Sequence, residues 1–359
     1  MHAPFPYFGG KSRAAPLVWS LLGNPPNYVE PFCGSAAMLL ARPDGPGNVE
    51  TVNDACGFIA NFWRAVACDP DAVAHYADWP VNEIDLTARH GWLVNRSERL
   101  RWSLDDPDFY DAKIAGWWVW GACNWLGSGW CEGRGPWRSN GAEVVDSRQL
   151  PHLSAGAGIN RQLPHLSAGQ GINRQLPHLG NAGQGINRQL PHLGNAGRGI
   201  NRKLPHLGDA GRGDRSEFIL DWMRGLSVRL REVRVACGDW LRVAGSESVT
   251  TRHGVTGIFL DPPYTLGKMD YAAGGVGGEL AAQVRDWCAT AGANPALRIV
   301  ICGHANEHDA LLPLGWTAHF WTARKGYAQT DEAKANSKGE TVWASPACVP
   351  VAAEELALA

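Results

Sequence analysis

The sequence predicts an α/β protein with a mostly parallel, doubly wound sheet, and three observations lead to that prediction. Short apolar, β-prone runs recur along the chain, helical patterns separate several of them, and acidic residues lie at the ends of several runs. Alternating strands and helices imply a parallel sheet that is covered by helices on both faces. In such a sheet, ligands bind beyond the carboxyl ends of the strands.

The expected elements follow from local patterns. Toward the N-terminus these are a strand at 27–30, a turn at 31–35, a helix at 36–41 that ends before Pro43, a strand at 50–54 and a helix at 59–66. Farther along they are an amphipathic helix at 217–232 and strands at 234–240, 257–260, 297–302 and 319–322. Four acids lie at ends of these strands: Glu30, Asp54, Asp239 and Asp261. Their placement indicates a binding site at the carboxyl edge of the sheet.

The segment Asp261-Pro262-Pro263-Tyr264 directly follows an apolar strand and suggests a specific chemistry. The two prolines make the backbone rigid. The Asp261 carboxylate and the Pro262 carbonyl would then offer two acceptors to the two hydrogens of an exocyclic amine, and Tyr264 would stack on its ring. Accepting both hydrogens makes the amine nucleophilic, so that positioning and hydrogen bonding carry the rate.

Composition limits the classes of protein to consider. The 359 residues are 45% hydrophobic and carry a formal charge of −2, which permits a large core and gives no overall basic signature for nucleic acid. The nine cysteines contain no C-x-x-C pair, so we expect reduced thiols, no disulfide framework and no metal. Without a signal-peptide pattern or a long apolar span, a cytoplasmic protein is expected.

A long insert at about 75–215 separates the second and third predicted strands, and 150–215 is a tandem repeat. Units beginning L-P-H-L start at 150, 163, 176, 190 and 204, and no acidic residue occurs between Asp146 and Asp209. One interpretation is a basic arm that contacts phosphates through Arg161, Arg174, Arg188 and Arg202. A duplicated glycine-rich loop without its own function is the alternative, and histidine-mediated metal binding is disfavoured because each unit has one histidine.

Tryptophans cluster within the insert, notably between Trp117 and Trp137. A compact core is the commoner use of such residues, and a DNA-stacking platform is the alternative.

Four motifs occur in an order that resembles the Dam-like DNA adenine-N6 methyltransferases. They are Tyr7-Phe8-Gly9-Gly10-Lys11, Glu30-Pro31-Phe32-Cys33-Gly34-Ser35-Ala36, Asn53-Asp54 and Asp261-Pro262-Pro263-Tyr264. The resemblance covers roughly 1–65 and 217–345 and implies a Rossmann-like S-adenosylmethionine-dependent sheet. It further implies a catalytic domain of 1–74 and 216–359, with 75–215 as the inserted target-recognition region.

The same resemblance implies roles for individual residues. The donor contacts would be Tyr7, Gly9, Gly10, Lys11, Glu30, Pro31, Phe32, Cys33, Gly34, Ser35, Asp54, Asp239 and Asp261. Asp54 would bond the ribose hydroxyls, although it could instead cap the following helix, and Asp239 could be a turn residue. Asp261, Pro262, Pro263 and Tyr264 would hold the flipped adenine. Cys33 is interpreted as a small tolerated residue and not as a nucleophile.

We therefore expect an enzyme that methylates adenine N6 at a specific site in double-stranded DNA, in a bacterial or phage-infected cell. The clamp would also serve another amine, such as cytosine N4, RNA or a protein amide. A catalytically silent DNA-binding relative is the remaining alternative. The sequence does not predict an oligomeric state.

Overall fold

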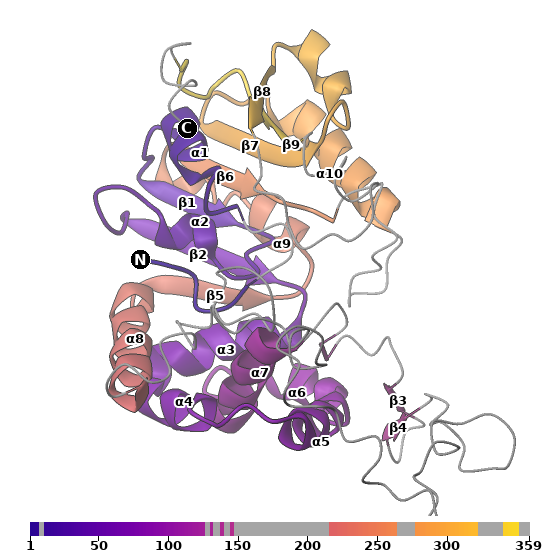
Figure 1. Ribbon diagram of the computed structural model, residues 1–359. Helices are drawn as coiled ribbons and strands as arrows, with labels where there is room; N and C mark the ends of the chain where they lie inside the picture. The colour runs from indigo at the N-terminus through magenta and orange to yellow at the C-terminus, as the bar shows by residue number, and fades with distance from the viewer. Residues whose placement is uncertain are drawn as a thin grey trace, which may run out of the picture.

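The computed structural model describes residues 1–6, 11–125, 130–131, 137–139, 144–146, 215–263, 277–321 and 340–351. Its centre is a seven-stranded sheet in the order β5-β2-β1-β6-β7-β9-β8 (Figure 1). The strands are β1 (Asn27–Glu30), β2 (Val49–Asp54), β5 (Val233–Cys237), β6 (Thr256–Leu260), β7 (Leu297–His304), β8 (Thr317–Trp321) and β9 (Glu340–Ala344). A separate hairpin joins β3 (Trp137–Ser139) to β4 (Val144–Asp146).

The first five strands in that order, β5 to β7, pair in parallel, which confirms the predicted mixed α/β architecture. Strand β9 was not predicted, and it pairs antiparallel with both β7 and β8. Because β9 runs in the opposite direction, its first residue, Glu340, lies beside His304 at the end of β7. The carboxyl edge of the parallel strands therefore also receives a residue from the start of β9.

Each helix that the sequence predicted is present, and its observed bounds lie near the predicted ones. The helices are α1 (Ala15–Leu22), α2 (Ala37–Leu40), α3 (Gly57–Cys68), α4 (Pro70–Ala77), α5 (Glu83–Val94), α6 (Ser97–Ser103), α7 (Ala112–Asn124), α8 (Arg215–Leu230), α9 (Leu241–Ala244) and α10 (Gly277–Ala291). Two 3-10 segments lie at Thr251–His253 and Asp309–Leu314.

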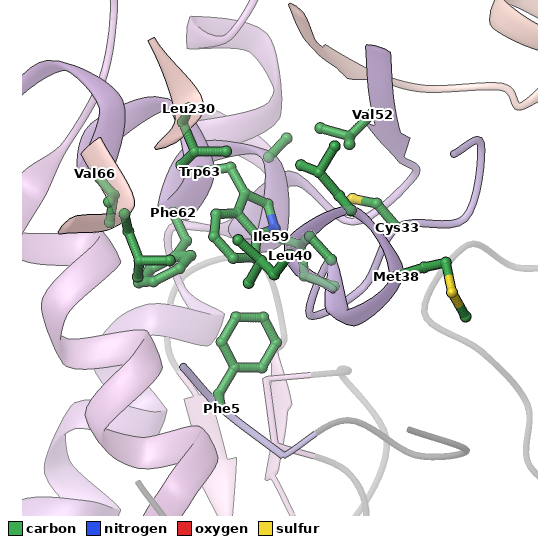
Figure 2. Close-up of a cluster of buried hydrophobic side chains, with 14 of the residues drawn as sticks. Phe5, Cys33, Met38, Leu40, Val52, Ile59, Phe62, Trp63, Val66 and Leu230 are labelled. Atoms are coloured by element: carbon green, nitrogen blue, oxygen red, sulfur yellow. The ribbon is translucent and has the colours of Figure 1, made fainter. Parts of the chain in front are cut away.

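Alternating side chains divide the core between the two faces of the sheet, as a doubly wound sheet requires. Tyr28 and Phe259 belong to the cluster that includes α1 and α3, whereas their neighbours Val29 and Ile258 belong to the cluster that includes α9 and α10. Figure 2 shows part of the first cluster, where Phe5 of the N-terminal segment lies near residues of α3. The ring centroids of Phe5 and Phe62 are 5.4 Å apart.

Helices α3 to α8 gather beside the β5 edge of the sheet (Figure 1). Helix α7 packs closely on α4, because a β-carbon at Gly116 would lie 2.7 Å from the Val73 carbonyl oxygen. Trp118 and Trp120 of α7 are buried, at 5% and 0% exposure, so these two tryptophans serve the core. The predicted domain boundary at 74/75 falls inside α4, and the division into two domains stays a prediction.

A buried group of three charges ties this helical region to the sheet. Glu50 of β2 pairs with two guanidinium groups: its Oε1 lies 2.9 Å from Arg42 Nη1 and 2.9 Å from Arg229 Nη2 of α8. Glu50 and Arg42 side chains are each 2% exposed. Arg229 Nη2 also donates to the Leu39 carbonyl oxygen, at 3.1 Å. One carboxylate thus compensates two arginines that lie far apart in the sequence.

We expect Glu50→Ala to lower the free energy of unfolding by about 3–5 kcal/mol, because it leaves buried arginines without their counter-charge. Urea denaturation followed by circular dichroism measures this loss. Asp71→Ala is the matched control, since Asp71 pairs with Arg224 at the surface and both side chains are more than half exposed. Equal losses for the two variants would contradict the assigned role of Glu50.

Candidate active site at the carboxyl edge of the sheet

The structure brings predicted acids to one edge of the sheet. Glu30 is the last residue of β1, Asp54 is the last residue of β2, and Asp261 directly follows β6. Since these strands are parallel neighbours in the sheet, their carboxyl ends lie side by side. Pro262 and Pro263 follow Asp261 and are buried.

Lys11 joins three segments at this edge. Its Nζ lies 3.1 Å from Asp261 Oδ1 and 3.5 Å from Glu340 Oε2, and its side chain is 4% exposed. Burial opposes the charged form of Lys11, but the carboxylates of Asp261 and Glu340 outweigh it, so that the pKa of Lys11 is raised above its ordinary value. Burial likewise raises the pKa of Glu340, while Lys11 acts in the opposite direction. The ammonium therefore stays protonated and holds the two acids together.

The turn after β1 is fixed in an unusual backbone conformation. Gly34 has φ of 45° and Ala36 has φ of 49°, both in the left-handed region. The Gly34 N–H donates to Asp54 Oδ2 at 3.0 Å, and the Gly34 carbonyl oxygen accepts from Trp63 Nε1 at 3.0 Å. Strand β2 and helix α3 thus hold this turn from two sides.

Asn53 links the ends of three strands. Its Nδ2 donates to the carbonyl oxygens of Pro31 and Gly238, each at 3.0 Å. The backbone adds two further bonds, because Cys33 N–H donates to the Asn53 carbonyl oxygen and Gly238 N–H donates to that of Asp54. The turns after β1 and β5 are consequently positioned by the end of β2.

Glu30 points into the protein and not into an open site. Its Oε2 accepts from the Tyr28 hydroxyl at 3.0 Å and from the Leu39 N–H of α2 at 3.1 Å. Glu30 is 2% exposed, and burial raises its pKa to about 8. A contact between Glu30 and a donor molecule remains a prediction, whereas its bonds to β1 and α2 favour a positioning role.

Asp54 uses both carboxylate oxygens within the protein. Oδ2 accepts from Gly34 N–H at 3.0 Å, and Oδ1 accepts from Cys56 N–H at 2.8 Å, just before α3. The second bond agrees with the alternative that Asp54 supports the start of the helix. Burial raises the pKa of Asp54 to about 6, against the effect of the two N–H donors, so that the carboxylate is mostly ionised at neutral pH.

The other predicted residues that the structure describes make contacts of their own. Phe32 stacks on Trp240, with ring centroids 5.9 Å apart. Asp239 is exposed and accepts from the Leu241 N–H at 2.7 Å, which fits the alternative of a turn residue. Cys33 and Ser35 are 6% and 5% exposed, and burial raises the pKa of the Cys33 thiol, which disfavours a nucleophile.

Several expectations concern residues outside the described ranges and stay predictions. These residues are Tyr7, Gly9, Gly10, Tyr264, Arg161, Arg174, Arg188 and Arg202, together with the repeat at 150–215.

Three residues of this edge were not predicted as site residues: Glu340, Asn53 and Trp63. Glu340 lies just before a short apolar run at 342–344, but only the reversed direction of β9 brings Glu340 to the edge. Asn53 belongs to a recognised motif, yet its role depends on Gly238, which lies far along the chain.

Neither a metal-binding cluster nor a membrane-spanning helix occurs within the described ranges. There, no three or more His, Cys, Asp or Glu side chains group in a way that could hold a metal ion. No helix within those ranges is long and apolar enough to cross a membrane.

Comparison with known families supports the resemblance. Residues 7–100 match the family described as D12 class N6 adenine-specific DNA methyltransferase. This range contains the first three of the four motifs and confirms the predicted resemblance to Dam-like enzymes, whereas the Asp261 segment lies beyond it. No curated protein matches the chain.

Protonation of Glu30 gives a prediction for the pH dependence of stability. The folded chain keeps this proton up to about pH 8, whereas the ordinary pKa of the side chain is 4.5. The folded state therefore binds more protons between these values, and the contribution of Glu30 to stability is full below pH 4.5 and is lost as pH rises through 8.

We expect Glu30→Gln to reduce this loss by at least about 1 kcal/mol between pH 5 and pH 8, since glutamine has no proton to release. Urea denaturation of the wild type and the variant at several pH values provides the measurement. Glu232→Gln is the control because Glu232 is exposed. Parallel pH profiles for wild type and Glu30→Gln would refute the assignment.

Proposed function

We infer the function from one premise: through residues 7–100, the chain belongs to the D12 class of N6 adenine-specific DNA methyltransferases. The protein is accordingly an adenine-specific DNA methyltransferase that modifies the exocyclic N6. The observation that carries the chemical proposal is the Asp261 carboxylate, held by Lys11 at the end of β6, at 3.1 Å.

S-adenosylmethionine is the donor that we propose, as is general for methyltransferases. When bound, it supplies an electrophilic methyl group on a positively charged sulfur. The carboxyl edge fits such a molecule, because its described residues include the carboxylates of Asp54, Asp261 and Glu340 beside the ammonium of Lys11. The Gly34 turn allows close backbone approach, and each oxygen of Asp54 has room in its lone pairs for a ribose hydroxyl besides its N–H donor.

Asp261 would act on the target adenine as an acceptor. The Asp261 carboxylate and the Pro262 carbonyl would accept hydrogen bonds from the two hydrogens of N6. These bonds leave the nitrogen lone pair free to attack the methyl group. Buried Pro262 and Pro263 restrict the backbone around these acceptors. After transfer, the amino nitrogen gives up one proton, for which Asp261 is the acceptor within reach.

Lys11 and Glu340 would position Asp261. We assign Lys11 this role because its ammonium contacts two carboxylates. The resemblance instead predicts a contact between Lys11 and the donor. Glu340 balances the charge of Lys11 and limits how far Lys11 neutralises Asp261.

Double-stranded DNA is the proposed substrate, with the adenine extruded from the helix. The clamp lies at the buried edge of a sheet and cannot reach N6 within a stacked duplex. The insert between β2 and β5 is the proposed reader of the flanking sequence, and its arginine-bearing repeat would contact the phosphates.

Sequencing of modified bases tests this function directly. The full chain is expressed in a bacterial strain without DNA methylation, and the genome is sequenced with a method that reads modified bases. N6-methyladenine in one short sequence motif is the expected result. An unmodified genome, or methylcytosine in place of methyladenine, would overturn the proposed substrate.

Asp261→Ala is expected to lower the rate of methyl transfer at least about a hundredfold, because one of the two acceptors of the amine is lost. Donor binding should largely survive, since the turn after β1 and Asp54 are unchanged. Methyl transfer to DNA and calorimetric titration with S-adenosylmethionine measure the two effects.

Two checks accompany this variant. A thermal melt verifies that the variant is folded. We expect an intact fold because Lys11 still has Glu340 as a counter-charge. Asp286→Ala is the control because Asp286 is 72% exposed on α10. Full activity of Asp261→Ala would refute the mechanism.

A further inference from the structure

The helical region contains a cleft that is separate from the carboxyl edge of the sheet. Its volume is about 920 Å³, and it lies among α4, α5, α7 and the start of α8. Trp79, Trp92 and Trp117 line it, together with Asp78, Asp85 and Arg89. None of the candidate active-site residues contributes to its lining. Aromatic walls with a few polar groups are typical of pockets for small molecules, and this volume lies within their usual range.

Arg89 is a buried cation, and the residues that the structure describes provide no acceptor for its Nη1. The residue is 6% exposed, and its guanidinium carbon lies 4.8 Å, 4.8 Å and 4.3 Å from the ring centroids of Trp79, Trp117 and Trp120. Among the described residues, its Nη1 has no hydrogen-bond partner and no carboxylate lies within ion-pair distance. Cation–π contacts offset part of the burial cost but leave N–H donors unmatched.

Asp85 supplies a hydrogen-bond acceptor in the same cleft, whereas Arg89 supplies donors. Its Oδ2 accepts from Trp79 Nε1 at 2.5 Å and from Asn82 Nδ2 at 2.6 Å. These two donors fix the side chain and lower the pKa of Asp85. Its Oδ1 accepts no hydrogen bond from any residue that the structure describes. The cleft thus presents a carboxylate oxygen in a fixed position as well as the guanidinium group of Arg89.

Simple ions match this arrangement poorly. An anion would be attracted to Arg89 but repelled by Asp78 and Asp85, whereas a cation would experience the reverse. Asp71, which also lines the cleft, is already neutralised by Arg224, whose Nη2 lies 2.7 Å from Asp71 Oδ2. A flat, neutral molecule with acceptors on one edge and donors on the next would satisfy both side chains and stack on tryptophan.

We propose that this cleft binds a guanine base. Guanine carries adjacent acceptors at O6 and N7, which is the pair that an arginine recognises with two N–H groups. Its neighbouring N1–H and N2 amino groups would donate to Asp85, and its plane would stack on a tryptophan ring. Adenine and cytosine lack two adjacent acceptors beside two adjacent donors. The base would belong either to a free nucleoside or to an unpaired position in DNA.

Calorimetric titration of the full-length protein tests the proposal. The donor site is first saturated with S-adenosylhomocysteine, so that nucleosides cannot bind there. Guanosine should bind with a stoichiometry of one, and inosine, which lacks the amino group, roughly tenfold or more weakly. The affinity for 7-deazaguanosine, which lacks N7, should be lower than that for guanosine by a similar factor, and adenosine should not bind. Thymine oligonucleotides with and without one guanine then distinguish a base in DNA from a free nucleoside.

Variants assign the contacts. Asp85→Asn should weaken guanosine binding and remove the preference for guanosine over inosine, an effect that general destabilisation does not produce. If Arg89→Met folds, it should remove the preference for guanosine over 7-deazaguanosine. If it does not fold, the result for Asp85→Asn decides the test. Asp71→Asn is the matched control in the same cleft and should change neither preference. Equal affinity for all nucleosides, no binding of any, or an unchanged preference in Asp85→Asn would overturn the proposal.

Discussion

The ammonium of Lys11 is the constraint on which the carboxyl edge depends. It joins the N-terminal segment to Asp261 after β6 and to Glu340 at the start of β9. Without this cation, the carboxylates of Asp261 and Glu340 would repel each other in a partly buried site. A single ammonium therefore compensates two carboxylates that come from different segments of the chain. The contact between Lys11 and Glu340 also requires the antiparallel strand β9 to be in register with β7.

Backbone groups, more than side chains, shape the rest of the site. The turn after β1 is held by Asp54 and Trp63, and Asn53 connects it to the turn after β5. Each of these bonds restrains a peptide group and not a flexible side chain. A donor molecule would accordingly meet a surface that is already formed, which lowers the entropic cost of binding. Residues such as Glu30, which bond only within the protein, belong to this supporting layer.

Local patterns were sufficient for the parallel part of the sheet, because each strand there coincides with a short β-prone run in the sequence. They were insufficient for β9, whose direction depends on pairing with β7 and β8. The motifs identified Lys11, Asp54 and Asp261, but their spacing could not show that Lys11 contacts two acids or that Glu30 points inward. Such facts depend on contacts between segments far apart in the chain. The tryptophan cluster shows the same limit, since Trp120 is buried whereas Trp117 lines a cleft.

The packing of α7 and α8 has a consequence for the evolution of the insert. Both helices pack on α4, one before the tandem repeat and one after it. Each helix is therefore held by its own contacts with α4, which do not involve the 13- or 14-residue units that lie between the two helices in the sequence. A gain or loss of one unit during evolution would leave these contacts unchanged.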